Sequence, residues 1–275
     1  MSLVGRGSTS NNYVIATNSS LNFPNADWCF WCWVFLTNWS GTSEEDVWTT
    51  NGAQTAGNAG VMWRLMQNTG ATSPGKARLT YRDDAAVNAT RASVNDIPLY
   101  QPVLLFFQRT GSNNQLWMGV RGQLPVLEVQ SSNGSLGTIT SAVDWKVGCR
   151  AGASATAALR AGNEVWGCGK ADVALLPEEI AYLATGASPL WLGRSLVVYL
   201  PFNNGPESTV FDISGTANHG TRNGNFDTGF ADVLPYAEVM PVKRRSLLGA
   251  TQPPAGGQIL APARYDGLGG FRRGV

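Results

Sequence analysis

Short segments in which apolar and polar residues alternate recur along most of this chain, and clusters rich in Gly, Pro, Asn and Ser separate them. Residues 61–66 and 77–82 are two clear examples, and the turn signal Asn51-Gly52 precedes the first. A period of two residues is that of a β-strand with one buried face. About a dozen such strands at short spacing predict an all-β fold, a jelly-roll β-sandwich with one short helix.

Two apolar runs, residues 28–36 and 103–107, lack this alternation and predict central strands that are buried on both faces. The first run contains Cys29 and Cys32, which form a C-x-x-C pair. Side chains three residues apart on a strand lie on opposite faces of the sheet, and no second C-x-x-C follows. We therefore expect buried, reduced thiols rather than a zinc or redox site.

Residues 175–189 are almost the only segment that predicts a helix. A proline suits the first turn, two glutamates complement the positive end of the helix dipole, and apolar residues three apart share one face. A glycine then suits the left-handed cap, and Pro189 prevents the helix from resuming. The positions that carry this prediction are Pro177, Glu179, Ile180, Leu183 and Gly186.

Composition and hydropathy exclude several classes of partner and location. The formal net charge is +1, so bulk charge indicates no particular partner. The first residues lack the apolar core of a secretory signal, and the longest apolar run, 28–36, is too short to span a bilayer. We expect a protein that is made in a cytosol, is not secreted by a signal peptide and does not engage a membrane.

Two segments resemble a known family. Residues 172–189 follow strands that begin at Trp145 and Glu164, and residues 212–220 (Asp-Ile-Ser-Gly-Thr-Ala-Asn-His-Gly) follow the strand of residues 196–202. This order is similar to the laminin G-like, concanavalin A-like jelly-roll domain of the type found in phage virion proteins. The matching motif positions are Pro177, Glu179, Ile180, Leu183, Gly186, Asp212, Ser214, Gly215, His219 and Gly220.

The order of these segments departs from the family pattern. In most members the strand and the Asp-x-Ser-Gly turn open the domain, whereas here they follow the helix. Either the strand order is circularly shifted, which a jelly roll with neighbouring termini tolerates, or a second domain begins and is truncated. We favour the shifted order, with one sandwich domain over residues 1–230.

Residues 231–275 predict an extended C-terminal arm, because they are rich in Pro and Gly and show no sustained apolar period. Residues 241–275 carry six Lys or Arg against one Asp, although the whole chain has a net charge of only +1. The arm either stays solvated or orders on a neighbouring subunit or an acidic surface, and nucleic-acid binding is the weaker alternative. The candidate assembly contacts are Lys243, Arg244, Arg245, Arg264, Phe271, Arg272 and Arg273.

The residues present argue against catalysis. A Ser-His-Asp or Cys-His site requires a histidine, and the single His219 lies in a turn where a hydrogen bond within the loop explains it. Sandwich glycosidases of this superfamily carry Glu-x-Asp-x-x-Glu along one strand, a spacing that this chain does not reproduce. We predict no catalytic residues and no enzyme.

Glycan binding is harder to dismiss. Trp39 and Trp48 lie near Glu44, Glu45 and Asp46, so indole rings could stack on sugar rings while carboxylates hold calcium. Equally, Trp48 could face the core and the acids could only keep the loop soluble. No motif places a metal ligand, so we assign no metal and no cofactor, with calcium left unplaced.

These observations lead to one main hypothesis and two alternatives. The main hypothesis is a non-enzymatic phage virion structural protein, a capsid decoration protein or another head- or tail-associated protein anchored by its C-terminal arm. Its partners would be capsid or tail subunits and further copies of itself, with the virion as its location. The alternatives are a lectin-like module that attaches to host or environmental glycans and, third, a sandwich-fold glycosidase.

Overall fold

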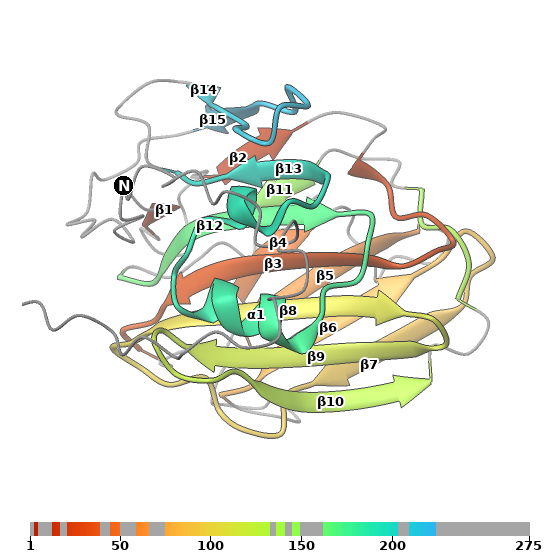
Figure 1. The fold of residues 1–275 in the computed structure, drawn as a ribbon, viewed down its shortest axis with the longest axis horizontal. Coiled ribbons are helices and arrows are strands. Elements are labelled where there is room, and N and C mark those ends of the chain that lie inside the picture. Colours follow the sequence, from red (N-terminus) through yellow and green to blue (C-terminus); the bar gives the residue numbers. More distant parts are fainter. Residues whose placement is uncertain are drawn as a thin grey trace, which may run out of the picture. The chain divides into compact units, whose positions relative to one another are not determined.

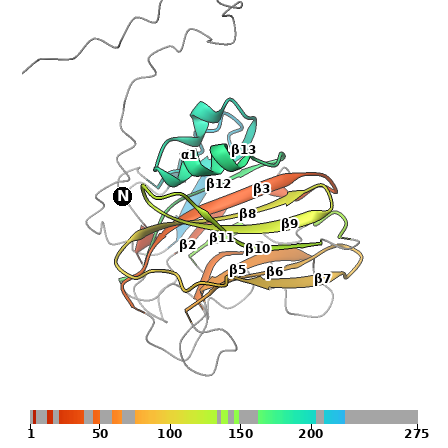
Figure 2. The same cartoon turned by 60° about the horizontal axis from the view of Figure 1, so that its bottom comes forward.

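The chain forms two stacked β-sheets, sheet A and sheet B, in a computed structural model. Figures 1 and 2 show the two sheets face to face, with the helix α1 on the outer side of sheet A. This arrangement is the predicted all-β sandwich. The structure describes residues 3–4, 13–16, 21–38, 45–49, 59–65, 75–132, 136–140, 145–148, 162–202 and 209–223.

Sheet A is antiparallel and has the strand order β1-β12-β3-β8-β9-β10, with β13 also paired with β12. The central strands β3 and β8 are long and buried on both faces, as the two apolar runs predict, and β12 is also largely buried. The strands are β1 (Leu3–Val4), β3 (Trp28–Phe35), β8 (Pro102–Thr110), β9 (Asn113–Val120), β10 (Val126–Ser132), β12 (Glu164–Ala171) and β13 (Leu196–Leu200).

Sheet B is also antiparallel, with the order β14-β15-β2-β11-β4-β5-β6-β7. The period-two segments at 61–66 and 77–82 form its neighbouring strands β5 and β6. Its strands are β2 (Tyr13–Ala16), β4 (Glu45–Thr49), β5 (Gly60–Leu65), β6 (Ala77–Arg82), β7 (Asn88–Ala92), β11 (Trp145–Val147), β14 (Thr209–Val210) and β15 (Gly220–Asn223).

The main core lies between the sheets and is rich in aromatic rings. Phe30 of sheet A meets Trp63 of sheet B edge to face, with ring centroids 4.9 Å apart. Trp28, Phe107 and Tyr81 extend this cluster. Each fully buried aromatic side chain stabilises the fold by about 2–3 kcal/mol through burial alone, so this cluster fixes how the two sheets stack.

A second apolar cluster covers the outer face of sheet A, where α1 (Pro177–Ala184) packs. Ile180, Leu183 and Ala184 are buried there with Trp31 and Phe106 of the sheet. Pro177 opens the helix as predicted, and Gly186 follows it in the left-handed conformation, with a φ of 88°. The 3-10 helix η2 (Pro189–Leu192) then begins at Pro189, because proline fits a first helical position.

The two cysteines of the C-x-x-C pair belong to different clusters, as the strand period predicts. Cys29 lies in the outer cluster beneath α1, and Cys32 lies in the core between the sheets. Both thiols are free and fully buried, and burial raises the pKa of each well above its ordinary value. They therefore serve as small apolar side chains of a central strand.

Two features of the strand pairing do not follow from the sequence pattern. The neighbouring apolar segments 13–16 and 21–23 could suggest a hairpin at a sheet edge, but β2 pairs with β11 and β15 inside sheet B, while Phe23 forms a bridge with Ile139. The sequence pattern does not predict the strand β7, since its residues Asn-Ala-Thr-Arg-Ala show no alternation of apolar and polar side chains. Its pairing depends on backbone hydrogen bonds to β6, which a side-chain pattern does not reveal.

The strands after the helix join the same two sheets instead of opening another sandwich. β13 pairs with β12 in sheet A, and β15 pairs with β2 in sheet B. These strands therefore belong to the same sandwich, and a circular shift of the strand order relative to the resembled family stays a prediction.

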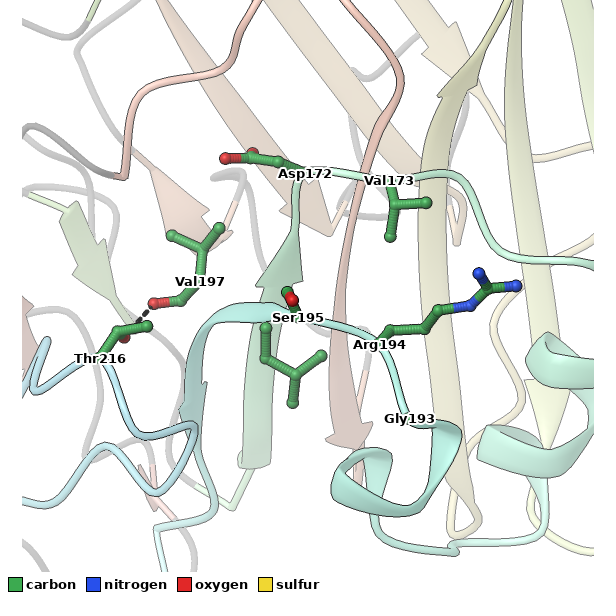
Figure 3. Close-up of a pocket in the computed structure, with 8 residues that line it drawn as sticks. Asp172, Val173, Gly193, Arg194, Ser195, Val197 and Thr216 are labelled. Carbon is green, nitrogen blue, oxygen red and sulfur yellow. Dashed lines mark hydrogen bonds between the residues drawn. The ribbon is translucent and has the colours of Figure 1, made fainter. Parts of the chain in front are cut away.

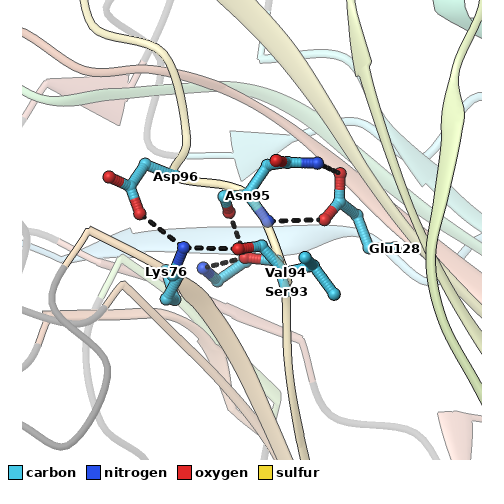
Figure 4. A network of polar contacts seen from close by, with 7 residues as sticks. Lys76, Ser93, Val94, Asn95, Asp96 and Glu128 are labelled. Carbon is cyan, nitrogen blue, oxygen red and sulfur yellow. Dashed lines mark hydrogen bonds and ion pairs between the residues drawn. The ribbon is translucent and has the colours of Figure 1, made fainter.

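Polar side chains connect the edges of the sheets on the β7–β10 side. Glu128, at the bulge of β10, is 6% exposed and accepts hydrogen bonds from the backbone N–H and the side-chain amide of Asn95, at 2.8 and 3.0 Å (Figure 4). Arg91 of β7 likewise donates to the hydroxyl of Ser131 and to the carbonyl of Ser132. These contacts satisfy groups that an open sandwich edge would leave unpaired.

Candidate functional site

A shallow pocket of about 530 Å³ opens where the chain leaves β12 and re-enters the sheet as β13. The end of η2 and the turn between β14 and β15 complete its wall (Figure 3). Its lining combines aliphatic side chains with a few charged and hydroxyl groups, which is the usual composition of a small-molecule site. It is lined by Asp172, Val173, Gly193, Arg194, Ser195, Leu196, Val197 and Thr216.

Asp172 is anchored from beneath by a buried lysine. Lys170 is fully buried at an inward position of β12, and its ammonium lies 5.2 Å from the centroid of the Phe23 ring. The same ammonium forms an ion pair with Oδ1 of Asp172, whose side chain is 44% exposed. Burial lowers the pKa of Lys170, and the charge of Asp172 opposes that shift. The buried cation thus holds a half-exposed carboxylate in place at the pocket rim.

Arg194 is held away from the pocket interior. Its Nε and Nη2 donate to the two carboxylate oxygens of Glu179 in α1, at 2.8 and 3.1 Å. Glu179 also accepts the backbone N–H of Leu176 at 2.8 Å, which satisfies one free donor at the helix start. In Figure 3 the guanidinium points away from Asp172 and Thr216. Partial burial acts to raise the pKa of Glu179, but these hydrogen bonds hold it below its ordinary value.

The turn between β14 and β15 is organised by Asp212. Its Oδ1 accepts the N–H groups of Tyr199 and Ser214, and its Oδ2 accepts the hydroxyls of Ser214 and Thr216 and the N–H of Asn218, all at 2.8–2.9 Å. Burial acts to raise the pKa of Asp212, but these donors hold it below its ordinary value. The network places Thr216 on the pocket wall.

His219 belongs to the same turn and has a local role. Its Nδ1 accepts the backbone N–H of Asp212 at 3.0 Å, and its ring meets the edge of Phe211 with centroids 5.4 Å apart. Gly215 has a φ of 95°, a conformation that glycine adopts without strain. These contacts match the hydrogen-bonding role expected for His219 from the sequence.

The two family motif segments meet at the pocket. Glu179 in α1 holds Arg194, and Asp212 in the turn holds Thr216, so each segment positions one lining residue. The sequence did not single out Lys170, Asp172 or Ser195. One signal was available: Lys170 near the end of β12 and Asp172 directly after it are two residues apart, and such residues share a face in extended chain.

The sequence-predicted glycan and assembly residues are mostly outside the described part of the chain. Trp39 and Glu44 lie there, and Glu45, Asp46 and Trp48 belong to β4 but their side chains are not among those described. Every predicted assembly contact also lies outside the described residues: Lys243, Arg244, Arg245, Arg264, Phe271, Arg272 and Arg273.

Chemically, the pocket suits a ligand with hydroxyl groups. Asp172 offers acceptor oxygens, Ser195 offers a hydroxyl, and Val173, Leu196 and Val197 contribute aliphatic side chains. Trp191 in η2, two residues before Gly193, is 47% exposed beside this wall. Over the residues that the structure describes, no three His, Cys, Asp or Glu side chains gather as a metal site requires. No helix in the same part of the chain is long and apolar enough to cross a membrane.

Comparison with known proteins identifies the fold. No protein-family model matches the chain, and no curated protein matches it. The solved structure of a Bacteroides ovatus protein assigned to carbohydrate binding aligns with a TM-score of 0.55 and 12% identity. That alignment covers 82% of this chain and 59% of the other, so the chain spans about three fifths of that protein.

Two further solved structures align more loosely. A SAP-like pentraxin from Limulus polyphemus has a TM-score of 0.46 and 12% identity over 67% of this chain and 81% of its own. The CBM40 of a Ruminococcus gnavus sialidase, bound to α2,3 sialyllactose, has a TM-score of 0.42 and 11% identity, over 62% of this chain and 95% of its own. The likeness to the Bacteroides ovatus structure concerns the fold alone and shows that the chain is a jelly-roll β-sandwich.

Proposed function

We propose that this protein is a non-catalytic, lectin-like module that binds a carbohydrate in the pocket between β12, β13 and the 211–219 turn. The observation that carries the proposal is the Lys170–Asp172 pair, in which a fully buried cation orients a half-exposed carboxylate in a pocket that aliphatic side chains also line. Orienting an acceptor in advance reduces the entropy lost on binding. A carboxylate is also a strong acceptor for the hydroxyl groups of a sugar.

The volume and the fold support the same proposal. A cavity of about 530 Å³ lies within the range of small-molecule sites and accommodates one or two sugar rings. The Bacteroides ovatus protein with the same fold is assigned to carbohydrate binding. Glycan binding was the alternative hypothesis from the sequence, and these observations favour it over the virion role.

The pocket does not offer the pair of carboxyl groups that a sandwich glycosidase uses. In such enzymes one carboxyl group acts as the acid and a second acts as nucleophile or base, and the two lie about 5–9.5 Å apart on either side of the scissile bond. Of the described lining residues, Asp172 alone carries a carboxylate, and the nearby Glu179 is engaged by Arg194 and the Leu176 amide. The absence of a partner carboxyl at this rim supports binding without hydrolysis.

A glycan array probed with the full-length protein, followed by calorimetry on the best ligands, tests the proposal. Ser195→Trp fills the pocket from an exposed position and should weaken binding by about tenfold or more, because the new side chain occupies the ligand volume. Ser112→Trp, in the exposed β8–β9 turn, is the matched control and should bind as the wild type does. Equal binding by both variants would place the site elsewhere, and no binding by the wild type would refute the function.

The virion hypothesis stays a prediction, because it depends on residues 231–275, which lie outside the described residues. Association with capsid or tail subunits, self-association and a virion location belong to the same prediction. Deletion of residues 231–275 should abolish incorporation into particles if the arm anchors the protein, while unchanged incorporation would contradict that role.

A further inference from the structure

We infer that this pocket selects by charge, binding neutral, hydroxyl-rich saccharides and discriminating against saccharides that carry a carboxylate. The inference rests on the proposed glycan-binding function and names the ligand class for the same site. Its basis is how each charged group around the pocket is oriented and engaged.

The Lys170–Asp172 pair presents its negative end to the ligand. The ammonium of Lys170 is fully buried inside the sandwich, next to Phe23, whereas the carboxylate of Asp172 is 44% exposed and lines the pocket. A ligand therefore reaches the carboxylate and does not reach the cation. Such a dipole attracts hydroxyl donors and repels an anion.

The only cation among the described lining residues, Arg194, is already occupied. Its guanidinium makes two hydrogen bonds to Glu179, at 2.8 and 3.1 Å, and points away from Asp172. An arginine is the usual partner of a ligand carboxylate, because a guanidinium and a carboxylate form a bidentate pair. Glu179 takes that role here, so an anionic ligand would have to displace it.

The remaining polar groups of the pocket wall do not present a charge to a ligand. Both oxygens of Asp212 are satisfied by donors of their own turn and by the N–H of Tyr199 in β13, so this carboxylate positions Thr216 and is not offered to a ligand. Ser195 contributes a hydroxyl group, whereas the hydroxyl of Thr216 is engaged by the carboxylate of Asp212 and the carbonyl of Val197. Asp172 therefore dominates the local field, and it should favour a neutral saccharide over its carboxylated form by about tenfold at low salt.

The test is an array of matched pairs, in which each neutral oligosaccharide is printed beside the same backbone with its 6-hydroxymethyl group oxidised to a carboxylate. The wild-type protein should bind the neutral member about tenfold more strongly, and 0.5 M salt should reduce this preference. Equal or stronger binding of the carboxylated member would overturn the inference while leaving glycan binding intact. No binding of either member would instead refute the proposed function itself.

Two charge-matched variants identify the source of the preference. Glu179→Gln should release Arg194 and narrow the preference severalfold by improving binding of the carboxylated member. Glu178→Gln removes the same charge from the neighbouring, exposed position of α1 and should leave the preference as in the wild type. An equal change in both variants would mean that only net charge matters, which contradicts a role for the engaged Arg194.

Discussion

The backbone N–H of Tyr199 in β13 donates a 2.9 Å hydrogen bond to Oδ1 of Asp212, in the turn that connects β14 and β15. The N–H of Ile213 returns a 3.1 Å bond to the carbonyl of Tyr199. Because β13 belongs to sheet A and β14 and β15 belong to sheet B, these bonds join the two sheets along one side. The same carboxylate holds the pocket residue Thr216.

Replacing Asp212 should therefore destabilise the fold strongly. Asp212→Ala leaves five donors without their acceptor in a site where the residue is only 6% exposed, and we expect a loss of about 3–5 kcal/mol in the free energy of unfolding. Urea denaturation followed by tryptophan fluorescence measures it. Asp96→Ala removes an exposed carboxylate that is paired with Lys76 and should cost less than about 1 kcal/mol. Similar losses in both variants would contradict the structural role of Asp212.

Stability should fall at acidic pH. The pKa of Asp212 is lowered in the folded protein, so the unfolded chain binds a proton more readily than the folded one does. The stabilisation is fully present above the unfolded value and is lost as pH falls through the folded value. Glu179, whose pKa is also lowered, acts in the same direction. Unfolding midpoints measured from pH 6 down to pH 2 should decrease most steeply below about pH 4, and less steeply in Asp212→Asn. Equal slopes would show that Asp212 contributes nothing to acid sensitivity.

Gly169 of β12 has no room for a side chain. A Cβ built there would overlap Cζ2 of Trp31 and lie 2.8 Å from its Cε2, since the indole ring covers this glycine on the outer face of sheet A. Gly169→Ala should cost about 3 kcal/mol or more, because a central strand and a buried ring are both forced to shift.

A double-mutant cycle checks the cause of this loss. Trp31→Phe removes the part of the ring that the new methyl group would meet, so Gly169→Ala should cost much less in that background. Additive losses, measured by chemical denaturation of all four proteins, would show that the steric conflict is not with Trp31.

Glu128 should stabilise the contact between the two sheets on the β7–β10 side of the sandwich. Glu128→Ala removes the acceptor for two donors of Asn95 at a buried position, and we expect a loss of about 1–3 kcal/mol. Hydrogen exchange at the Asn95 amide should accelerate at the same time. Gln123→Ala, in the exposed loop before β10, is the control and should change neither quantity measurably. Unchanged exchange in Glu128→Ala would contradict the edge contact.

Strands and helix could be predicted wherever the side-chain pattern matches the burial of the element. The alternating segments became β5 and β6, the apolar runs became β3 and β8, and the proline and glycine of the helix segment mark its ends. The opposite faces of Cys29 and Cys32 also followed from strand geometry. In each case neighbouring residues carry the information, because burial repeats with the period of the backbone.

The pairing of the strands and the composition of the candidate site could not be predicted from the sequence and are seen in the tertiary structure alone. β2 lies between β11 and β15, and β7 forms with no apolar pattern, because sheet hydrogen bonds link backbones that are distant in sequence. The pocket joins Asp172 after β12, Ser195 before β13 and Thr216 in a later turn. Lys170 and Asp212 orient this rim from the core and from the turn. Such convergence depends on which strands become neighbours, and no local periodicity records that choice.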